Sequence, residues 1–485
     1  GEERTKQVLP FQRTPNLTAK PDIDLSVITQ DIYKLYGASR ARIDFSSSAP
    51  EVALQAHPLQ WVETVGSNNW VITGERTASG KPIMANDPHR RIQIPSLRYL
   101  VHLNAPGWNV IGAGEPVLPG VSIGHNEHGA WGLTIFSIDQ EDLYVYRTNP
   151  DNADQYWYNG GWRDMEVEPV TIHVKGQPAV TRELRYAHHG PVLSQNAEKN
   201  IAFGMQAVWL EKGAAPYLAS LRMDQAESWS AFREACAYSG LPGENMVWAD
   251  RDGHIGWQSV GYTPIRFGWD GRLPVPGDGT YDWHGMIPIS AMPHMVDPED
   301  GWYGTANHNN VPPHYANVFA DFYSDPARSW RLDEVLSGSA GHTIESSMAL
   351  QYDNKSMTAE RLVPVLLSLD PVDGLEASWE LLDAWDYVMD RDSGAALIYD
   401  KWELAMLAAL NHQVMPDQDE LITRIKLREW MSEPPVHMFG EDPEKARDAL
   451  MIESFHSAVS MLREAFGTDV SQWAYGEVHV SHIEH

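Results

Sequence analysis

Cysteine is almost absent from this chain, which carries a single one, Cys236, in 485 residues. One cysteine cannot form a disulfide within the chain, so thiol usage says nothing about the compartment in which the protein works. Long apolar runs are also missing, because no stretch of about eighteen consecutive apolar residues occurs. The sequence therefore contains no segment with the length and character of a membrane-spanning helix.

Positive charge is scarce as well. The chain has 36 Lys and Arg against 66 Asp and Glu, which gives a formal net charge of −30. A surface this acidic repels phosphate backbones, so nucleic-acid binding is a poor hypothesis. The carboxylates either hold a hard cation or simply keep the surface soluble, and the second role is the default.

What the chain does contain is typical of a globular protein. Apolar residues make up 43% of it, and 19 of its residues are Trp. A chain of this length buries a large core and has room for two or three domains.

The hydrophobic pattern changes along the chain. Residues 1–66 are rich in Pro, Ser, Thr and charge, with only short periodic stretches. From Ser67 onwards short strands are predicted, beginning with a hairpin formed by residues 70–73 and 82–85 around a turn at 78–80. Past Ser324 the periodicity becomes helical. Many strands followed by helices indicate an α+β fold.

The stretch Gly66-Ser67-Asn68-Asn69 precedes the apolar residues that open this hairpin. If the Gly66–Ser67 bond is cut, Ser67 gains an α-amine beside its own hydroxyl, and one residue then supplies both nucleophile and base. An α-amine titrates near 7.7–8.0, so a usable fraction is unprotonated at neutral pH. Taken alone, the stretch is more typical of a plain turn entering a strand.

Several blocks of sequence support the catalytic interpretation. They are Ser67-Asn68-Asn69-Trp70-Val71, Ala85-Asn86-Asp87-Pro88-His89, Gly124-His125-Asn126, Ala130-Trp131-Gly132 and Asn307-His308-Asn309-Asn310. In their order and spacing they resemble the penicillin acylase family of N-terminal-nucleophile hydrolases, and the resemblance runs from Ser67 to the end of the chain. It implies a four-layer αββα sandwich of two antiparallel sheets, with a mostly helical C-terminal half.

The resemblance also implies a domain division. Residues 1–66 correspond to the end of an α chain plus a spacer removed on maturation, and residues 67–485 to the catalytic β chain. The α chain from the same precursor would then be the partner in a heterodimer. Compared with the family, the chain resembles an interior piece that lacks both ends, and a periplasmic or secreted location is expected.

Catalytic roles follow from matching motif to motif. Ser67 is expected to be the nucleophile, with Asn309 and the backbone N–H of Ile135 as donors to the oxyanion. His89 is expected to position the amine, and Arg331 to lie near it and lower its pKa. Without the resemblance, the Asn-rich loop would be a turn and His89 an ordinary loop residue. A surface role, paired with Asp333 or Glu334, is assigned to Arg328 instead.

A structural calcium site is the expected cofactor feature, and no organic cofactor is expected. The turn Asp139-Gln140-Glu141-Asp142 resembles the family's calcium-binding turn, with Asp139 and Asp142 giving carboxylates and Glu141 a carbonyl. The carbonyl of Gly271 and the carboxylate of Asp321 are weaker matches. Calcium takes six to eight oxygen ligands, more than this chain supplies. The competing interpretation is a solvated acidic turn.

The implied activity is that of a self-processing amidohydrolase that cleaves an N-acyl small molecule through a serine acyl-enzyme. Arg90 and Ser137 stand where aromatic residues of the acyl pocket are expected, which predicts a more polar pocket unless Arg90 points to solvent. Acyl-homoserine lactone or lipopeptide acylases are the alternative within the superfamily. From other classes, a glycoside hydrolase lacks a paired-carboxylate motif here, and a non-catalytic, calcium-stabilised binding protein would remain uncut.

Overall fold

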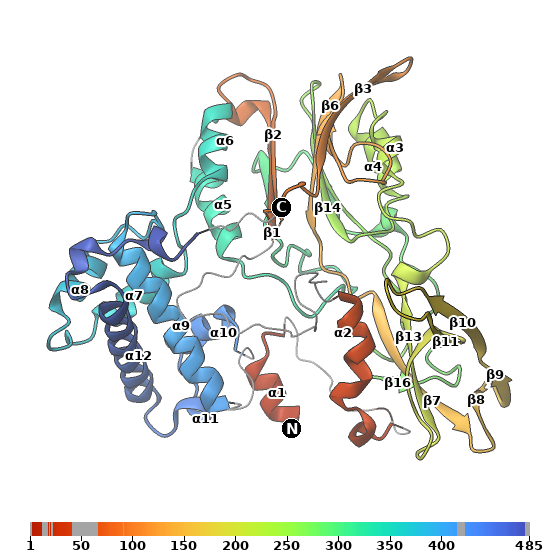
Figure 1. Cartoon of the computed structure of the whole chain (residues 1–485). Coiled ribbons are helices and arrows are strands. Elements are labelled where there is room, and N and C mark those ends of the chain that lie inside the picture. The colour runs from red at the N-terminus through yellow and green to blue at the C-terminus, as the bar shows by residue number, and fades with distance from the viewer. Residues whose placement is uncertain are drawn as a thin grey trace.

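The computed structural model describes residues 2–11, 18, 20, 23–40, 66–90, 92–338, 340–414 and 422–480. Strands predominate between positions 66 and 305 and helices after 327 (Figure 1). The mixed α+β class predicted from the sequence is thereby confirmed, as is the helical character of the chain past Ser324. Of residues 1–66, which are predicted to be the end of an α chain plus a spacer, residues 41–65 lie outside the described residues.

The hairpin at Ser67 is formed by β1 (Gly66–Ile72) and β2 (Ile83–His89). The two strands are antiparallel, and Ser67 lies opposite Pro88. On its other edge β1 pairs with β18 (Trp302–Thr305), which places Asn69 opposite Thr305. Trp70 and Val71 are both fully buried. Because neighbouring residues of a strand point to opposite faces, this three-stranded sheet is covered on both faces.

A seven-stranded antiparallel sheet packs beside the hairpin, with β1 and β2 against β6 and β14. In order across the sheet its strands are β17 (His294–Val296), β15 (Ile255–Val260), β14 (Glu244–Asp250), β6 (Gly129–Ile135), β5 (Ile123–His125), β4 (Trp108–Gly114) and β3 (Tyr99–Ala105).

Helices flank these two sheets on their outer sides (Figure 1). The short helices α3 (Ser220–Met223) and α4 (Trp229–Cys236) lie on the far face of the larger sheet, where α4 contacts β14 and β15. On the other side, α5 (Ala327–Gly338) contacts β18 and α6 (Ile344–Gln351) contacts β2. The end of β1 that carries Ser67 thus lies between a sheet and a helix.

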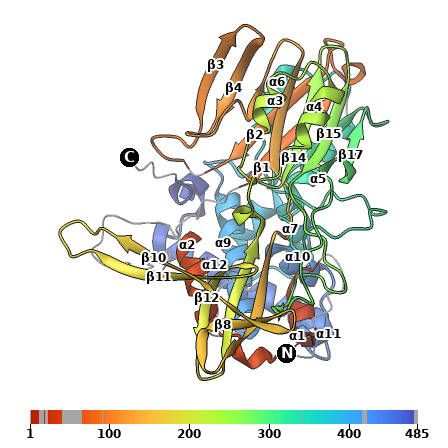
Figure 2. The ribbon, with the colours of Figure 1, turned by 90° about the vertical axis from the view of Figure 1, so that its right-hand side faces the viewer.

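A third sheet lies outside the two described above. Its strands are β10 (Glu166–Ile172), β11 (Val180–Ala187), β12 (Gly190–Asn196), β13 (Ile201–Ala207), β7 (Glu141–Asn149), β8 (Asn152–Tyr158), β9 (Gly161–Asp164) and, parallel to β7, β16 (Val275–Pro276). Its β10–β11 hairpin extends away from the body of the molecule (Figure 2). The sequence pattern predicted strands here but not their separation into a sheet of their own.

The C-terminal helices pack around their own core, in which Trp402 and Phe455 are fully buried. They are α7 (Ala359–Leu367), α8 (Glu376–Asp383), α9 (Gly394–Val414), α10 (Arg424–Ser432), α11 (Val436–Phe439) and α12 (Pro443–Phe466). The long helix α9 is apolar on most of its surface, and α12, α8 and α10 all pack on it. Among the described residues, no helix combines the length and the apolar character needed to cross a membrane.

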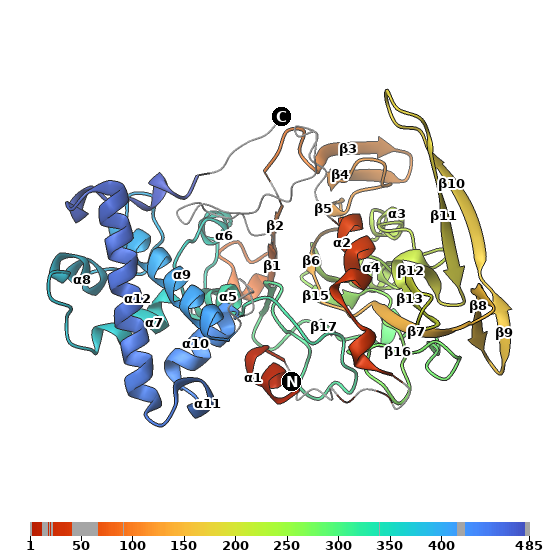
Figure 3. The same ribbon diagram turned by 60° about the horizontal axis from the view of Figure 1, so that its bottom comes forward.

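The described residues before position 41 contact both the helical part and the sheets (Figure 3). Helix α1 (Glu2–Val8) places Val8 in the core of the C-terminal helices, and the Phe11 ring packs against Phe322. Helix α2 (Lys34–Arg40) lies by the third sheet, where the Tyr36 hydroxyl donates to the Glu141 carboxylate. This segment therefore contacts both parts of the molecule.

Candidate active site

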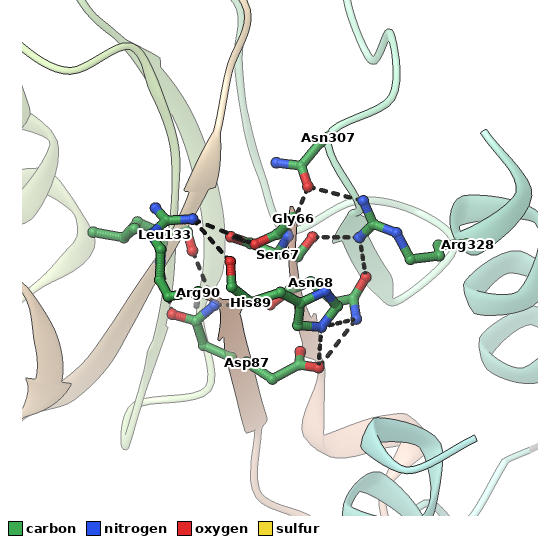
Figure 4. Close-up of polar contacts among 10 residues, drawn as sticks. Gly66, Ser67, Asn68, Asp87, His89, Arg90, Leu133, Asn307 and Arg328 are labelled. Atoms are coloured by element: carbon green, nitrogen blue, oxygen red, sulfur yellow. Dashed lines mark hydrogen bonds and ion pairs between the residues drawn. The ribbon is translucent and has the colours of Figure 1, made fainter. Parts of the chain in front are cut away.

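Ser67 is completely buried near the start of β1. Its hydroxyl donates a hydrogen bond to the carbonyl oxygen of Gly66, the residue before it (Figure 4). Its N–H donates to Asn307 Oδ1 over 2.7 Å. The Gly66–Ser67 peptide bond is intact here, so this nitrogen is an amide that stands in for the α-amine of a cleaved chain.

Asn307 follows β18 and has a backbone φ of 63°. This left-handed conformation is unusual for residues other than Gly, and Asn is among those that adopt it most readily. The conformation turns the side chain toward Ser67, and Nδ2 donates over 3.1 Å to the carbonyl oxygen of Ile135, at the end of β6. An amide nitrogen carries two hydrogens, so Nδ2 has a second one to offer to a substrate oxygen.

Arg328, in the first turn of α5, connects the surroundings of Ser67. Its Nη1 donates over 2.7 Å both to the Ser67 carbonyl oxygen and to Asn68 Oδ1, and its Nη2 donates over 3.0 Å to Asn307 Oδ1. Burial lowers the pKa of Arg328 from its usual value, yet a guanidinium in a protein stays charged. A fixed positive charge this close favours the neutral form of an α-amine at Ser67.

His89 lies at the end of β2, directly opposite Gly66. Its Nε2 is 3.0 Å from Asp87 Oδ2, and Asn68 Nδ2 donates to the same carboxylate oxygen over 3.1 Å. The ring is thus held by Asp87 and Asn68, and neither of these contacts involves Ser67 itself. This geometry supports a positioning role for His89, through the strand that it shares with the scissile bond.

Two of the residues predicted from the sequence lie elsewhere, and the structure corrects them. Asn309 is exposed, and its Oδ1 accepts from the N–H of Val311 two residues later, as in an Asx turn. Arg331 forms ion pairs with Glu334 at 2.8 Å and Asp353 at 2.6 Å. The residues in contact with Ser67 are instead Asn307 and Arg328, the neighbours of those predicted on the same loop and the same helix.

Gly66 leaves no room for a side chain. A Cβ at this position would lie 2.9 Å from Arg328 Nη2 and 3.3 Å from His89 Nδ1. We expect Gly66→Ala to slow cleavage of the 66–67 bond by about tenfold or more, because Arg328 must move away from Ser67 to admit the methyl group. The measurement is a time course of the cleaved fraction by intact-mass spectrometry.

Gly338→Ala is the matched control, because a Cβ there meets nothing within 4 Å, although the residue lies on the same helix as Arg328. Cleavage in this variant should follow the time course of the unmodified protein. Equal cleavage rates in the Gly66 and Gly338 variants would contradict the steric argument.

The predicted calcium ligands lie away from Ser67, near the start of β7. Asp142 has a fully buried side chain, and its Oδ1 has no hydrogen-bond partner among the described residues. Its Oδ2 accepts from Arg266 over 2.7 Å, and the same guanidinium lies 3.4 Å from Asp139 Oδ2. Burial raises the pKa of Asp139 to about 7, and the charge of Asp142 adds to the effect. An unpartnered buried oxygen next to a second carboxylate fits a hard cation.

The other three predicted ligands differ in how they are placed. A Cβ on Gly271 would lie 2.6 Å from Asp139 Oδ2, so its backbone borders the two carboxylates. Asp321 is held by two hydrogen bonds from Arg272. The Glu141 carboxylate accepts from the Tyr36 hydroxyl, whereas the ligand predicted from this residue is its backbone carbonyl.

A second cluster with metal-ligand chemistry is formed by His188, His189 and Asp282. His189 is hydrogen-bonded through Nδ1 to the Tyr146 hydroxyl at 2.6 Å and through Nε2 to Asp282 Oδ1 at 2.8 Å. The Tyr158 hydroxyl donates to Asp282 Oδ2 over 2.6 Å. These contacts satisfy the buried histidine and its carboxylate, so the cluster is explained as a structural network.

Known proteins resemble this chain over most of its length. The family model described as "Penicillin amidase" matches residues 1–485. Acyl-homoserine lactone acylase QuiP of Pseudomonas aeruginosa is 27% identical over 474 residues, which covers 88% of this chain and 55% of that protein. Penicillin acylase 2 proenzyme of Pseudomonas sp. is 31% identical over 350 residues, covering 70% of this chain and 44% of that protein.

A solved structure of thermostable penicillin G acylase from Alcaligenes faecalis shares the fold, with a TM-score of 0.72 at 24% identity, over 84% of this chain and 80% of that one. The chain spans about half the length of the curated relatives it matches. Because the family model covers the whole sequence, the chain belongs to the penicillin amidase family of hydrolases.

Proposed function

We propose that this protein is a self-processing amidohydrolase that cleaves the acyl group from an N-acylated small molecule. The observation that carries the proposal is the set of contacts at Ser67. Its hydroxyl donates a hydrogen bond to the carbonyl oxygen of Gly66, which belongs to the peptide bond to be cut. Its nitrogen lies 2.7 Å from Asn307 Oδ1. Arg328 donates to both Ser67 and Asn307. The hydroxyl and the nitrogen of Ser67 thus lie beside the side-chain amide of Asn307.

Self-processing begins with the hydroxyl of Ser67. Its oxygen adds to the Gly66 carbonyl carbon, and the C–N bond then breaks with transfer of a proton to nitrogen, which leaves Gly66 esterified to the serine. Water hydrolyses this ester to a Gly66 carboxylate and a free Ser67 hydroxyl. The nitrogen released in the first step becomes the α-amine that the second reaction needs.

Amide hydrolysis reuses the same groups. The Ser67 hydroxyl attacks the acyl carbonyl while the α-amine takes its proton, and the oxyanion accepts from Asn307 Nδ2 and the N–H of Ile135. The amine product leaves with the proton of the α-ammonium. Water, activated by the α-amine, then releases the acid from the acyl-enzyme.

Further expectations from the resemblance stay part of this proposal. The order helix, sheet, sheet, helix across Figure 1 would be the four-layer αββα sandwich of the N-terminal-nucleophile hydrolases. Residues 1–66 would supply the end of an α chain and the spacer, and residues 67–485 the catalytic chain. A heterodimer of these two chains in the periplasm or outside the cell would be the mature form.

An acyl-homoserine lactone acylase is the second candidate, and one observation favours it. Two relatives that match 96% of this chain carry that name. This activity would need an apolar pocket long enough for an aliphatic chain. A panel of phenylacetyl, aliphatic and dicarboxylic acyl anilides, together with N-acyl homoserine lactones, tests the proposal. A protein that stays uncut and releases no acid from any of them would be a binding protein.

For the metal we propose a structural Ca²⁺ bound by the carboxylates of Asp139 and Asp142, with the carbonyls of Glu141 and Gly271 and the carboxylate of Asp321 as further ligands. Bound there, the ion would hold the start of β7 to the loop that carries Gly271. We expect chelation of calcium at pH 7 to lower Tm by roughly 3 °C, because a ligand at 100 times its Kd stabilises the native state by about 2.7 kcal/mol.

The measurement is a thermal melt in EDTA and in excess CaCl₂. Asp142→Asn removes the buried charge that faces the ion, so its Tm should not respond to calcium. Identical melts of the unmodified protein in the two buffers would rule the site out.

A further inference from the structure

Asn245 is a buried polar residue of β14 that the mechanism above does not use. It is 1% exposed, and it lies opposite Thr134 in the ladder between β14 and β6, next to the pair formed by Glu244 and Ile135. A buried amide needs partners for two donor hydrogens and for an acceptor oxygen. The partners of Asn245 therefore show which segments of the chain it connects.

The first partner is the end of β6, which carries one of the proposed oxyanion donors. Asn245 Nδ2 donates over 3.1 Å to Thr134 Oγ1 and over 3.3 Å to the carbonyl oxygen of Ile135. The Phe136 N–H donates to the Gly243 carbonyl oxygen, and bonded and non-bonded pairs alternate along an antiparallel ladder. The Ile135 N–H is accordingly directed away from β14, which leaves it outside the bonds of this ladder.

The second partner is the loop that carries Asn307. Asn310, three residues further along this loop, donates through Nδ2 over 2.8 Å to Asn245 Oδ1. The indole N–H of Trp257 donates to the same oxygen over 2.9 Å. Asn307 itself donates to the carbonyl oxygen of Ile135. The side-chain amides of Asn245 and Asn307 thus donate to one carbonyl oxygen, at the strand end where the other oxyanion donor lies.

The third partner is β1, the strand that carries Ser67. Asn69 Nδ2 donates over 3.2 Å to the carbonyl oxygen of Asn245, and Asn69 Oδ1 accepts from the Thr305 hydroxyl over 2.6 Å. The hydroxyls of Thr305 and Thr134 lie 2.6 Å apart, which closes the network between β1, β18 and β6. Asn69, Thr134 and Thr305 are completely buried, where hydrogen bonds are electrostatically stronger than in water.

We propose that Asn245 is a positioning residue for amide hydrolysis, which holds the strand of the nucleophile and both oxyanion donors at fixed distances from one another. Asn245 acts through Ile135 and Asn307 and does not touch the substrate itself. An oxyanion donor has to lie about 2.7–3.1 Å from the developing charge, so a small shift of β6 or of the Asn307 loop weakens it. The inference rests on the proposed amide hydrolysis and adds a residue to it.

The test is Asn245→Ala, which removes the side-chain bonds and keeps the backbone bond to Asn69. The substrate is the acyl 4-nitroanilide of the panel that the unmodified protein hydrolyses fastest. Per free N-terminal serine, kcat should fall about 10- to 100-fold while KM stays nearly unchanged. Displaced donors weaken the binding of the transition state more than that of the substrate.

Gln258→Ala is the matched control. Gln258 is also 1% exposed and lies on β15, the neighbouring strand of the same sheet. Its Nε2 donates to the carbonyl oxygens of Ser259 and Ile289, and its Oε1 accepts from Arg233. The loss of this amide should lower Tm about as much as the loss of Asn245, but kcat should stay close to that of the unmodified protein.

Asn245→Asp adds a measurement that a role in folding alone would not affect. The carboxylate form keeps the acceptor for Asn310 and Trp257 but has no hydrogen for Thr134 or Ile135, whereas the protonated form supplies one. Its kcat, divided by that of the unmodified protein at the same pH, should therefore rise as the pH falls from about 9 to about 6.

Equal losses of kcat in Asn245→Ala and Gln258→Ala, or a ratio for Asn245→Asp that does not change with pH, would overturn the inference and leave the proposed function standing. An Asn245→Ala chain that stays uncut while the Gln258→Ala chain is cut supports the inference, because the same strands hold Ser67 at its own peptide bond. An unmodified protein that stays uncut before Ser67 and releases no acid from any anilide of the panel overturns both.

Discussion

Replacing Ser67 with alanine should abolish both reactions of this protein, the cut before residue 67 and the hydrolysis of acyl amides. Among the described residues, the side chains that donate to the Gly66 carbonyl oxygen are the Ser67 hydroxyl and the Arg90 guanidinium, and of these two the hydroxyl is the nucleophile. Loss of a catalytic nucleophile lowers turnover by about 10⁴-fold or more. Intact-mass spectrometry should find Ser67→Ala as one uncut chain and the unmodified protein as a chain starting Ser67-Asn68-Asn69.

Ser67→Cys separates the two roles of the residue. A thiol in the same buried place can still attack the Gly66 carbonyl, so the chain should be cut, while amide hydrolysis should fall because the amine and the oxyanion donors are placed for oxygen. A folded Ser67→Ala protein that still released acid from an acyl anilide would contradict the mechanism. So would an unmodified protein that turned over substrate with its 66–67 bond whole.

The hairpin that carries Ser67 was predictable because its determinants are local. An apolar run, a short polar turn and a second run predict two paired strands, and β1 and β2 pair as expected. The partner on the other edge was not predictable in this way. Asn69 and Thr305 are 236 residues apart (305 − 69), and nothing in either segment specifies the other as its neighbour.

The misplaced arginine shows what sequence patterns do not distinguish. Arg328 and Arg331 lie one helical turn apart on α5, so both project from a similar face. Their tertiary contacts differ. Arg331 forms an ion pair with Asp353, 22 residues further along the chain, whereas Arg328 donates a hydrogen bond to the carbonyl oxygen of Ser67. Motif matching locates this stretch of the helix and its arginines, but it does not identify the tertiary partner of each arginine.

The amide that faces Ser67 offers the sharpest test of the site. We expect Asn307→Ala to lower kcat by about 10²–10³-fold, the usual effect of removing one oxyanion donor. Asn309→Ala should have almost no effect, because that side chain bonds the backbone of its own loop. The two residues are of the same type and two positions apart, so each controls for the other.

Asn307 also holds Ser67 N in the uncut chain, so its loss could slow cleavage as well as turnover. Rates should therefore be divided by the amount of free N-terminal serine, determined by N-terminal sequencing of each preparation. Asn307→Asp adds a second measurement, because it keeps the acceptor for Ser67 N and removes the Nδ2 donor; it should restore cleavage more than turnover. If Asn309→Ala proved the more damaging substitution, the loop would have to turn its second amide toward the serine in the cleaved enzyme.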